Sequence, residues 1–566
     1  MYILGLNYPG HDTAAALVKD GKLICAVEEE RLSRRKHTKE FPDMAIKFCL
    51  EKENIKINDL DAITIGIVPW RMYADKFIFH TLRYFPKSLA LAFQEAHYYK
   101  PYFDAEKELR RRTGFKNKVK FVNHHDSHMA SSYYLSPFDY SAILSIDGLG
   151  EYESTVCGVG KGNRIIRKYK KYFPHSIGLL YAAVTHYLGF KFNSDEGKVM
   201  GLAPYGDPAV YHEKFKDILK LKPNGDYKLN LKYFTFPFKR DKWVSDEFIR
   251  VFGTMRGRDE ELTQKHKDIA AALQIVLEEG VIHIAQHLHK LTKTSNICLA
   301  GGVALNCVAN GRLMKETPFK NVFVQPAAGD AGVAIGAALH HYYNIKKSDG
   351  GSPHPHLKST YLGPEFSEDQ YMSAANKHNL KYKKSADITG DAAKLLAAGK
   401  ILGWFQGAME FGPRALGNRS IITAPYPADM KDTLNSKVKH REGFRPFAPS
   451  VLYEKCAEYF DCDFESPYML LVYNVLPEKI EKVSAIAHID GTGRVQTVTR
   501  DVNPLYYDLI RRFGEITGVP LILNTSFNVR GEPIVCAPEN AINCFLNTKM
   551  DYLVLGDLLI SKDENT

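Results

Sequence analysis

The same short pattern of apolar runs and glycine-containing loops occurs twice in the first half of the sequence. The first copy comprises apolar runs at 2–6, 13–18 and 23–27, with Asn7-Tyr-Pro-Gly-His-Asp12 after the first run. The second copy comprises 142–146, 154–159 and 165–166, with Asp147-Gly-Leu-Gly150 after the first run. Short apolar runs between glycine-containing turns are typical of β-strands. Unless the likeness is coincidental, a duplicated strand–loop–strand unit follows, whose loops present N–H groups to a phosphate.

The length of the chain requires more than one core. At ~150 residues per domain, 566 residues predict two or three domains. Residues 345–360 are rich in Gly, Pro, Ser and charge without periodicity, which is typical of a linker. We therefore expect an N-terminal domain at 1–344, a linker at 345–360 and a C-terminal domain at 361–566.

Two further segments of the N-terminal part have the pattern of ligand loops. A helix is predicted from Asp268 to Leu291, and after it an apolar strand leads through Gly301-Gly302 to a helix start at Asn306. This order can seat a phosphate at a helix N-terminus, so Gly301, Gly302 and Asn306 are nucleotide-binding candidates. Lys198 lies in the glycine-rich segment 193–206 and is another candidate, with a plain surface turn as the alternative.

A pair of histidines lies four residues apart in Asn123-His-His-Asp-Ser-His128. On a helix, His124 and His128 would point from one face and could share a metal ion. Asp147 and Asp330, each beside glycine, are the candidate carboxylate ligands. Such a set suits Fe²⁺, Mn²⁺ or Zn²⁺, and the ligands alone do not choose among them.

Spacing by itself is a weak signal for a metal site. His283 and His287 have the same spacing on the long predicted helix, but no Asp-Gly loop accompanies them. We interpret this second pair as partly buried or surface histidines.

The C-terminal part contains a series of cations in glycine- and proline-rich segments. Arginine forks on fixed loops suit bidentate binding of oxyanions. These cations lie in four segments, Trp404–Ser420, Lys437–Phe447, Asp490–Arg494 and Asn524–Pro533. This pattern predicts a polyphosphate site.

Composition excludes several classes of protein. No apolar run approaches the ~18–20 residues that span a bilayer, and the N-terminus has no basic region followed by a long apolar one. We therefore expect neither a membrane partner nor a signal peptide, and a cytoplasmic location. The nine cysteines contain no C-x-x-C and are expected to be reduced thiols. The net charge of +10 favours anionic ligands without demonstrating them.

Taken together, the motifs resemble those of the nodulation-protein/cephem O-carbamoyltransferase family from end to end. The resemblance rests on segments in this order: Gly10-His-Asp-Thr-Ala-Ala-Ala16, Glu28-Glu-Glu-Arg31, Arg34-Arg-Lys-His37, His124-His-Asp-Ser-His128, Ser145-Ile-Asp-Gly-Leu-Gly150, Gly197-Lys-Val-Met-Gly-Leu-Ala-Pro-Tyr-Gly206, Leu299-Ala-Gly-Gly-Val-Ala-Leu-Asn306, Phe411-Gly-Pro-Arg-Ala-Leu-Gly417, Phe444-Arg-Pro-Phe-Ala-Pro449 and Asn524-Thr-Ser-Phe-Asn528. The resemblance implies an α/β fold: a duplicated actin-like ATPase (Kae1-like) domain followed by a YrdC-like α/β domain.

The resemblance also implies a function. The YrdC-like domain would make carbamoyladenylate from ATP, with Mg²⁺, and carbamoyl phosphate. The Kae1-like domain would pass the carbamoyl group to a hydroxyl of a small molecule, as in antibiotic or secondary-metabolite biosynthesis. A divalent metal, iron in the characterised relatives, would be held by His124, His128, Asp147 and Asp330. His11 and Asp12 are the catalytic candidates, with His11 as base or hydrogen-bond donor. The residues that would hold ATP and carbamoyl phosphate are Arg414, Lys439, Arg445, Arg494, Arg530 and Ser526.

Two other functions compete with this one. A tRNA threonylcarbamoyladenosine-type enzyme is the main alternative, because both domains resemble parts of that pathway. The third is a non-catalytic nucleotide sensor. The order of the two domains in one chain and the complete metal set favour the carbamoyltransferase, so no nucleic-acid partner is expected. The identity of the acceptor, the native metal and the oligomeric state, with a homodimer as one option, stay open.

Overall fold

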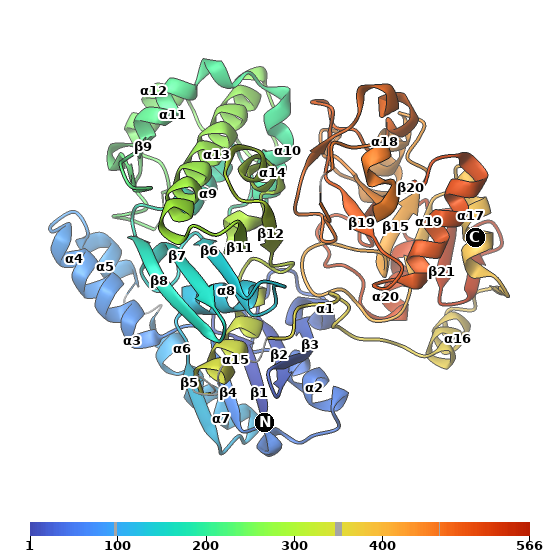
Figure 1. The fold of residues 1–566 in the computed structure, drawn as a ribbon, viewed down its shortest axis with the longest axis horizontal. Coiled ribbons are helices and arrows are strands. Elements are labelled where there is room, and N and C mark those ends of the chain that lie inside the picture. The colour runs from blue at the N-terminus through green and yellow to red at the C-terminus, as the bar shows by residue number, and fades with distance from the viewer. Residues whose placement is uncertain (96–98, 241, 346–353, 463, 566) are drawn as a thin grey trace. The chain divides into compact units, whose positions relative to one another are not determined.

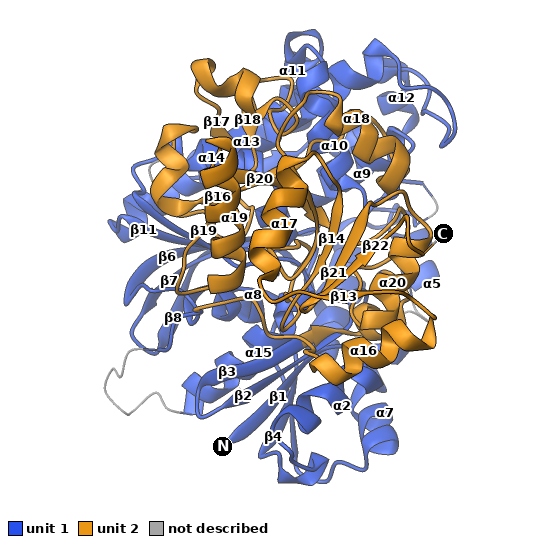
Figure 2. Cartoon of the chain, turned by 90° about the vertical axis from the view of Figure 1, so that its right-hand side faces the viewer, with its two compact units in different colours: residues 1–26, 37–357 blue, residues 27–36, 358–566 orange. Residues whose placement is uncertain are grey.

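The structure is a computed structural model that describes residues 1–95, 99–240, 242–345, 354–462 and 464–565. The chain divides into two compact units (Figure 2). Unit 1 comprises Met1–Ala26 and His37–Leu357, and unit 2 comprises Val27–Lys36 and Lys358–Thr566. Nothing in the sequence indicated that residues 27–36 group with unit 2 rather than with the rest of the N-terminal half. Of the predicted linker 345–360, residues 346–353 lie outside the described residues.

Unit 1 contains two five-stranded sheets that match strand for strand. The first has the order β3-β2-β1-β4-β5 and the second β8-β7-β6-β11-β12. In each, the first strand in sequence pairs antiparallel with the second and parallel with the fourth. The bounds are β1 Tyr2–Asn7, β2 Ala14–Lys19, β3 Lys22–Glu28, β4 Ala62–Ile65, β5 Lys118–Phe121, β6 Tyr140–Ile146, β7 Glu153–Lys161, β8 Arg164–Tyr172, β11 Asn296–Ala300 and β12 Asn321–Val324. The duplicated strand–loop–strand unit predicted from the sequence is confirmed.

Two helices between these sheets form the centre of unit 1 (Figure 1). Helix α15 (Ala331–Ile345) packs on β1 and β2, and helix α8 (His124–Tyr133) packs on β6 and on α15. Glycines permit this close contact: a Cβ on Gly336 of α15 would lie 1.7 Å from the Ser127 carbonyl oxygen of α8. A Cβ on Gly5 of β1 would lie 1.9 Å from the Ala334 carbonyl oxygen. The first turns of both helices are thereby fixed next to the loops that follow β1 and β6.

Among the other helices of unit 1, α2 (Asp43–Lys52) packs on β2, and α13 (Gln264–Thr292) packs on β6 and β7. The longest is α13, which confirms the helix predicted at 268–291. The others are α3 Pro69–Arg71, α4 His80–Arg83, α5 Leu89–Glu95, α6 Lys100–Phe103, α7 Ala105–Thr113, α9 Ile177–Tyr187, α10 Glu196–Leu202, α11 His212–Ile218, α12 Asp246–Phe252 and α14 Cys307–Glu316, and β9 Leu219–Leu221 pairs with β10 Tyr227–Leu229.

Unit 2 is a second α/β unit built on a mixed eight-stranded sheet. The order is β13-β22-β21-β14-β15-β20-β16-β19. The strands are β13 Lys383–Lys384, β14 Leu402–Phe405, β15 Arg419–Thr423, β16 Ala448–Leu452, β19 Gln496–Val498, β20 Leu521–Ser526, β21 Tyr552–Leu555 and β22 Leu558–Ser561, and a separate ribbon joins β17 Tyr473–Asn474 to β18 Thr492–Gly493. The helices are α1 Glu29–Ser33, α16 Glu368–Lys377, α17 Ile388–Ala397, α18 Met430–Leu434, α19 Pro504–Thr517 and α20 Pro538–Leu546. Among the described residues, no helix is long and apolar enough to cross a membrane.

Candidate functional site

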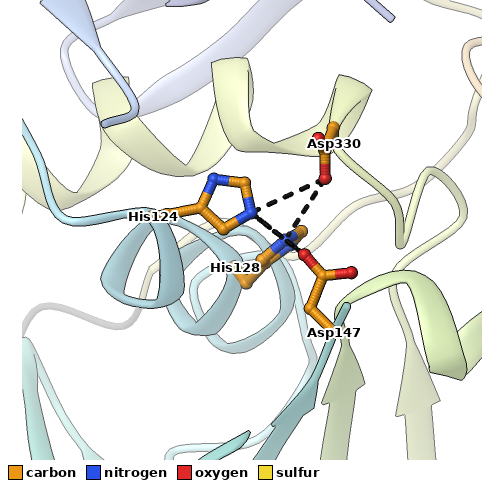
Figure 3. A group of neighbouring side chains, drawn as sticks. All are labelled: His124, His128, Asp147 and Asp330. Carbon is orange, nitrogen blue, oxygen red and sulfur yellow. Dashed lines mark hydrogen bonds and ion pairs between the residues drawn. The ribbon is translucent and has the colours of Figure 1, made fainter. Parts of the chain in front are cut away.

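Four side chains that the sequence singled out as metal ligands meet in unit 1. His124 and His128 extend from the first turns of α8, Asp147 follows β6, and Asp330 precedes α15. Figure 3 shows the two imidazoles and the two carboxylates pointing toward one another. One ligand atom from each residue can be chosen so that all four lie within 4.8 Å of one another. As the i,i+4 spacing predicted, both rings extend from the same face of α8.

The distances between these atoms fit a shared cation. The Nε2 atoms of His124 and His128 lie 3.0 Å apart. Asp147 Oδ2 lies 3.1 Å from His124 Nε2 and 3.4 Å from His128 Nε2. Asp330 Oδ1 lies 3.6 Å and 3.9 Å from the same two nitrogens. Ligands bound at ~2.0–2.2 Å to one metal lie roughly 2.9–3.6 Å from their neighbours, so this set can close around an ion with small movements.

The electrostatics of the group also favour a cation. Burial opposes charge on His124, but Asp147 and Asp330 outweigh burial and raise the pKa of His124 well above its ordinary value. Burial likewise opposes charge on Asp147, yet the hydrogen bonds from His124 and His128 hold the pKa of that carboxyl well below its usual range. Asp147 is thus an anion at neutral pH. The intervening His125 points elsewhere, toward Ser145 Oγ at 2.8 Å and the Glu153 carbonyl at 3.1 Å.

Two loops hold these ligands in place. The second carboxylate oxygen of Asp147 accepts the N–H of Gly148 at 2.8 Å and of Gly302 at 3.1 Å. At the start of α8, the buried carboxylate of Glu151 accepts the His124 N–H at 3.1 Å. The same carboxylate accepts Asn123 Nδ2 at 2.7 Å and the Val68 N–H at 2.9 Å. Sequence reasoning missed Glu151, although it directly follows the Asp147-Gly-Leu-Gly150 loop.

His11 and Asp12, the predicted catalytic residues, border the metal-ligand group. His11 Nε2 lies 3.5 Å from Asp330 Oδ2, and its Nδ1 lies 2.9 Å from Asp12 Oδ2. The Asp330 charge, against the effect of burial, raises the pKa of His11 to about 9, and Asp12 adds to the rise. The other Asp12 oxygen lies 2.7 Å from His37 Nδ1. His37 is therefore a further member of this network that the sequence did not assign.

The other unit 1 candidates have local roles in the structure. Gly301 has φ of +85°, and a Cβ there would lie 2.3 Å from the Ile146 carbonyl oxygen, so this position requires glycine. Gly302 gives its N–H to Asp147. Asn306 caps α14 through the Ala309 N–H and pairs with the amide of Gln274. Lys198 lies 3.2 Å from Asp195. Nucleotide binding by these four residues stays a prediction.

In unit 2, Lys439, Arg441, Arg445 and Arg494 form a group of cations that act on one another's charge. The buried Lys439 donates to the carbonyl oxygens of Ser526 and Asn528, both at 2.7 Å. Burial, Arg441 and Arg445 hold the pKa of Lys439 well below its usual range. Burial, Arg445 and Arg494 do the same to the pKa of Arg441. Binding of an anion next to such mutually repelling cations would stabilise their charged forms.

Arg530 and Arg414 are the remaining candidate cations of unit 2. Arg530 and Arg445 face the same carboxylate, Glu442, at 3.7 Å and 3.9 Å. Arg414 lies on a different loop, 406–418. That loop is tied to β20, because Asn524 donates to the Ala415 carbonyl at 3.2 Å, two residues before Ser526. Arg441 is an addition to the predicted set, and its position between Lys439 and Arg445 in sequence was the available signal.

Comparison with known families identifies the chain. The family model described as Carbamoyltransferase N-terminus matches residues 2–339, and the one described as Carbamoyltransferase C-terminus matches residues 393–562. The chain belongs to the carbamoyltransferase family. The family resemblance expected from the motifs is thus confirmed, and the chain is an enzyme of the carbamoyltransferase class.

Relatives within the carbamoyltransferase family align over nearly the whole chain. An uncharacterized protein of Synechocystis sp. is 43% identical over 99% of this chain and 97% of its own. Nodulation protein NolNO of Sinorhizobium fredii is 40% identical over 98% of this chain and 79% of its own. The 3'-hydroxymethylcephem-O-carbamoyltransferase of Streptomyces clavuligerus is 26% identical over 97% of both chains. The family's two matched segments fall largely in unit 1 and in unit 2, respectively.

Proposed function

We propose that this carbamoyltransferase works in two half-reactions, one in each unit. Unit 2 makes carbamoyladenylate from ATP and carbamoyl phosphate, and unit 1 transfers the carbamoyl group to a hydroxyl of a small molecule. The observation that carries the proposal is the separation of two kinds of groups. The His124, His128, Asp147 and Asp330 set lies in unit 1, and the cation group around Lys439 lies in unit 2.

The first half-reaction activates a poor electrophile. Carbamoyl phosphate and water give carbamate and phosphate, and a carbamate oxygen then attacks the α-phosphorus of ATP. The bond to pyrophosphate breaks, so carbamoyladenylate, pyrophosphate and phosphate are the products. Lys439, Arg441, Arg445 and Arg494 neutralise the phosphoryl oxygens, with Mg²⁺ accompanying ATP. Arg414, Arg530 and Ser526 complete the proposed site, because their loops adjoin β20 or face Glu442.

The second half-reaction uses the unit 1 group. His124, His128, Asp147 and Asp330 would hold a divalent metal, with Fe²⁺ preferred and Mn²⁺ or Zn²⁺ as alternatives. When bound, the metal supplies Lewis-acid polarisation of an oxygen. The acceptor oxygen bonds to the carbamoyl carbon, the bond from that carbon to the AMP phosphate oxygen breaks, and the hydroxyl proton passes to the departing AMP phosphate. His11 Nε2, 3.5 Å from Asp330 Oδ2, borders this set and is placed to donate a hydrogen bond to developing negative charge. Asp12 orients its ring through Nδ1.

The names of two relatives support a hydroxylated natural product as the acceptor. One relative is named a hydroxymethylcephem O-carbamoyltransferase and another a nodulation protein. The tRNA-modification alternative is not carried forward, because both family-model matches bear the carbamoyltransferase description.

The proposal is tested by following each half-reaction separately. Labelled pyrophosphate should exchange into ATP without an acceptor, and only when carbamoyl phosphate is present. Mass spectrometry of a panel of hydroxylated metabolites should then reveal a product that has gained one carbamoyl group. In His11→Ala the exchange should survive, while carbamoylation falls by ~100-fold or more.

Three results would contradict the proposal. Absence of exchange in the wild type would remove carbamoyladenylate as the intermediate. Binding of bulk tRNA and transfer of a threonylcarbamoyl group to it, in place of carbamoylation of small molecules, would favour the alternative function. Loss of exchange and transfer together in a folded His11→Ala protein would favour a single shared site.

A further inference from the structure

A short segment from near the N-terminus is part of unit 2. Residues Val27–Lys36 group with Lys358–Thr566, and they contain the helix α1 (Glu29–Ser33). The charged residues of this segment are unusually buried: Glu28, Glu29, Glu30 and Arg31 are each at most 6% exposed. Burying four charges is costly unless they are bonded, so their contacts indicate what the segment does.

Glu28 and Arg31 together bind both polar groups of one residue, Gly412. The Gly412 N–H donates to Glu28 Oε1 at 3.1 Å. Arg31 Nη2 donates to the Gly412 carbonyl at 3.0 Å and to Glu28 Oε1 at 3.4 Å. Arg31 Nη1 is also 3.1 Å from Glu30. A buried ion pair thus fixes this glycine two residues before Arg414.

A second set of contacts fastens the same segment independently. Arg34 donates to the carbonyl oxygens of Ile534 at 2.6 Å and of Pro533 at 2.8 Å. Leu32 packs against the buried cluster of Met409, Ile534 and Cys536. Because Met409 belongs to the Arg414 loop, the segment holds this loop by apolar packing as well as by hydrogen bonds.

The other side of Arg414 is held by a carboxylate from within the loop. Glu410 Oε1 accepts the N–H groups of Leu416 at 2.7 Å, Asn418 at 2.8 Å and Arg419 at 3.2 Å. Arg414 therefore lies between two fixed points, Gly412 before it and Leu416 after it. Pro413 restricts the backbone between Gly412 and Arg414 further, because its ring fixes φ.

We propose that Glu28 and Arg31 are positioning residues for Arg414, so that a segment encoded near the N-terminus completes the adenylate-forming unit at the other end of the chain. The proposal rests on the proposed function only in taking Arg414 as a ligand of ATP or carbamoyl phosphate. Glu28 and Arg31 act through the loop and contact no reactant themselves.

A double-mutant cycle tests whether Glu28 acts through Arg414. We expect Glu28→Ala to lower kcat/KM of the pyrophosphate exchange by about 10- to 100-fold, the size typical of a misplaced binding group. Arg414→Ala should lower it at least as much. The double variant should have the same kcat/KM as Arg414→Ala alone, because a shift of the loop has no effect on the reaction once the Arg414 side chain is absent. Glu51→Gln, an exposed carboxylate of α2, is the control and should exchange as the wild type does.

A general loss of stability would have a different outcome. The fold-losses in kcat/KM of the two single variants would then multiply in the double variant, and that result would overturn the proposal. Wild-type exchange in folded Glu28→Ala would also overturn it. If Glu28→Ala does not fold, Glu28→Gln takes its place. Its amide oxygen can still accept the Gly412 N–H, so kcat/KM of the exchange should fall only about threefold. In the Arg414→Ala background, Glu28→Gln should cause no further fall. A wild-type enzyme without exchange would refute the proposed function instead, and a fall in ATP affinity of Glu28→Ala would then still report the positioning of Arg414.

Discussion

Two histidine pairs with identical spacing have opposite surroundings in this protein. His124 and His128 direct their Nε2 atoms toward each other and toward two carboxylates. On α13, His283 Nε2 instead meets the carbonyl oxygens of Lys222 at 2.7 Å and Asp226 at 3.2 Å. A carbonyl-bonded imidazole beside a hairpin is a structural contact. His283 is therefore a matched control for His124.

We expect His124→Ala to lose bound metal and His283→Ala to keep it. Removing one of the four ligands weakens binding of the ion by the other three. Elemental analysis of the purified proteins measures their metal content. Pyrophosphate exchange should persist in both variants, because unit 2 is unaltered. Equal metal content in His124→Ala and wild type would show that the group does not hold the ion.

At the scale of elements, the start of α8 depends on one buried carboxylate. Glu151 is 2% exposed and accepts from three donors that lie outside its own loop: the Val68 N–H, the His124 N–H and Asn123 Nδ2. Burial raises the pKa of Glu151, although the nearby His124 opposes the rise. Its hydrogen bonds join Val68, directly before α3, to the helix that carries the two proposed metal ligands, His124 and His128.

Glu151→Ala should therefore destabilise the protein and weaken metal binding together. Leaving these buried donors without an acceptor is expected to cost about 2 kcal/mol or more, measured by denaturant unfolding. Glu151→Gln retains one acceptor oxygen and should lose less on both measures. Unchanged stability and metal content in Glu151→Ala would mean that water replaces the carboxylate without penalty.

The elements that depend on local pattern were predictable from the sequence. The apolar runs at 2–6 and 142–146 are β1 and β6. A helical spacing plus two aspartates beside glycine predicted four side chains that the structure brings together. The contacts that were missed join residues distant in sequence: Glu28 bonds Gly412 across 384 positions. The periodicity of a sequence does not predict such a pairing, because the bond depends on the tertiary fold of the chain.

Asn306 illustrates the opposite difficulty. A helix start after Gly301-Gly302 was predicted, and α14 does begin at Cys307. The Asn306 side chain, however, is occupied by the Ala309 N–H and by Gln274. Phosphate-binding turns and ordinary capped helices share this sequence pattern, so the sequence alone does not distinguish them.

At the scale of the whole molecule, the chain crosses between its units at 26/27, 36/37 and 357/358. A cut within the predicted linker 345–360 should therefore not free unit 2 from the N-terminal fragment. That fragment still carries Arg31 and Arg34, whose hydrogen bonds lie within unit 2. After cleavage at an introduced protease site, both fragments should co-elute in size-exclusion chromatography. In a protein that carries both Arg31→Ala and Arg34→Ala, a larger share of the two fragments should elute separately. Separation of the unmutated fragments would show that this segment contributes little to binding.

The same connectivity limits how such enzymes can be recombined. A chimera that joined the first 357 residues of this chain to the C-terminal half of a relative would pair Glu28, Arg31 and Arg34 with foreign loops in place of Gly412, Pro533 and Ile534. A modular exchange would have to transplant two stretches of gene, the codons for 27–36 as well as those from 358 onward. The gene segments that encode unit 2 are therefore discontinuous. Substitutions in the short first segment and in the long second one are expected to be inherited as compensating pairs.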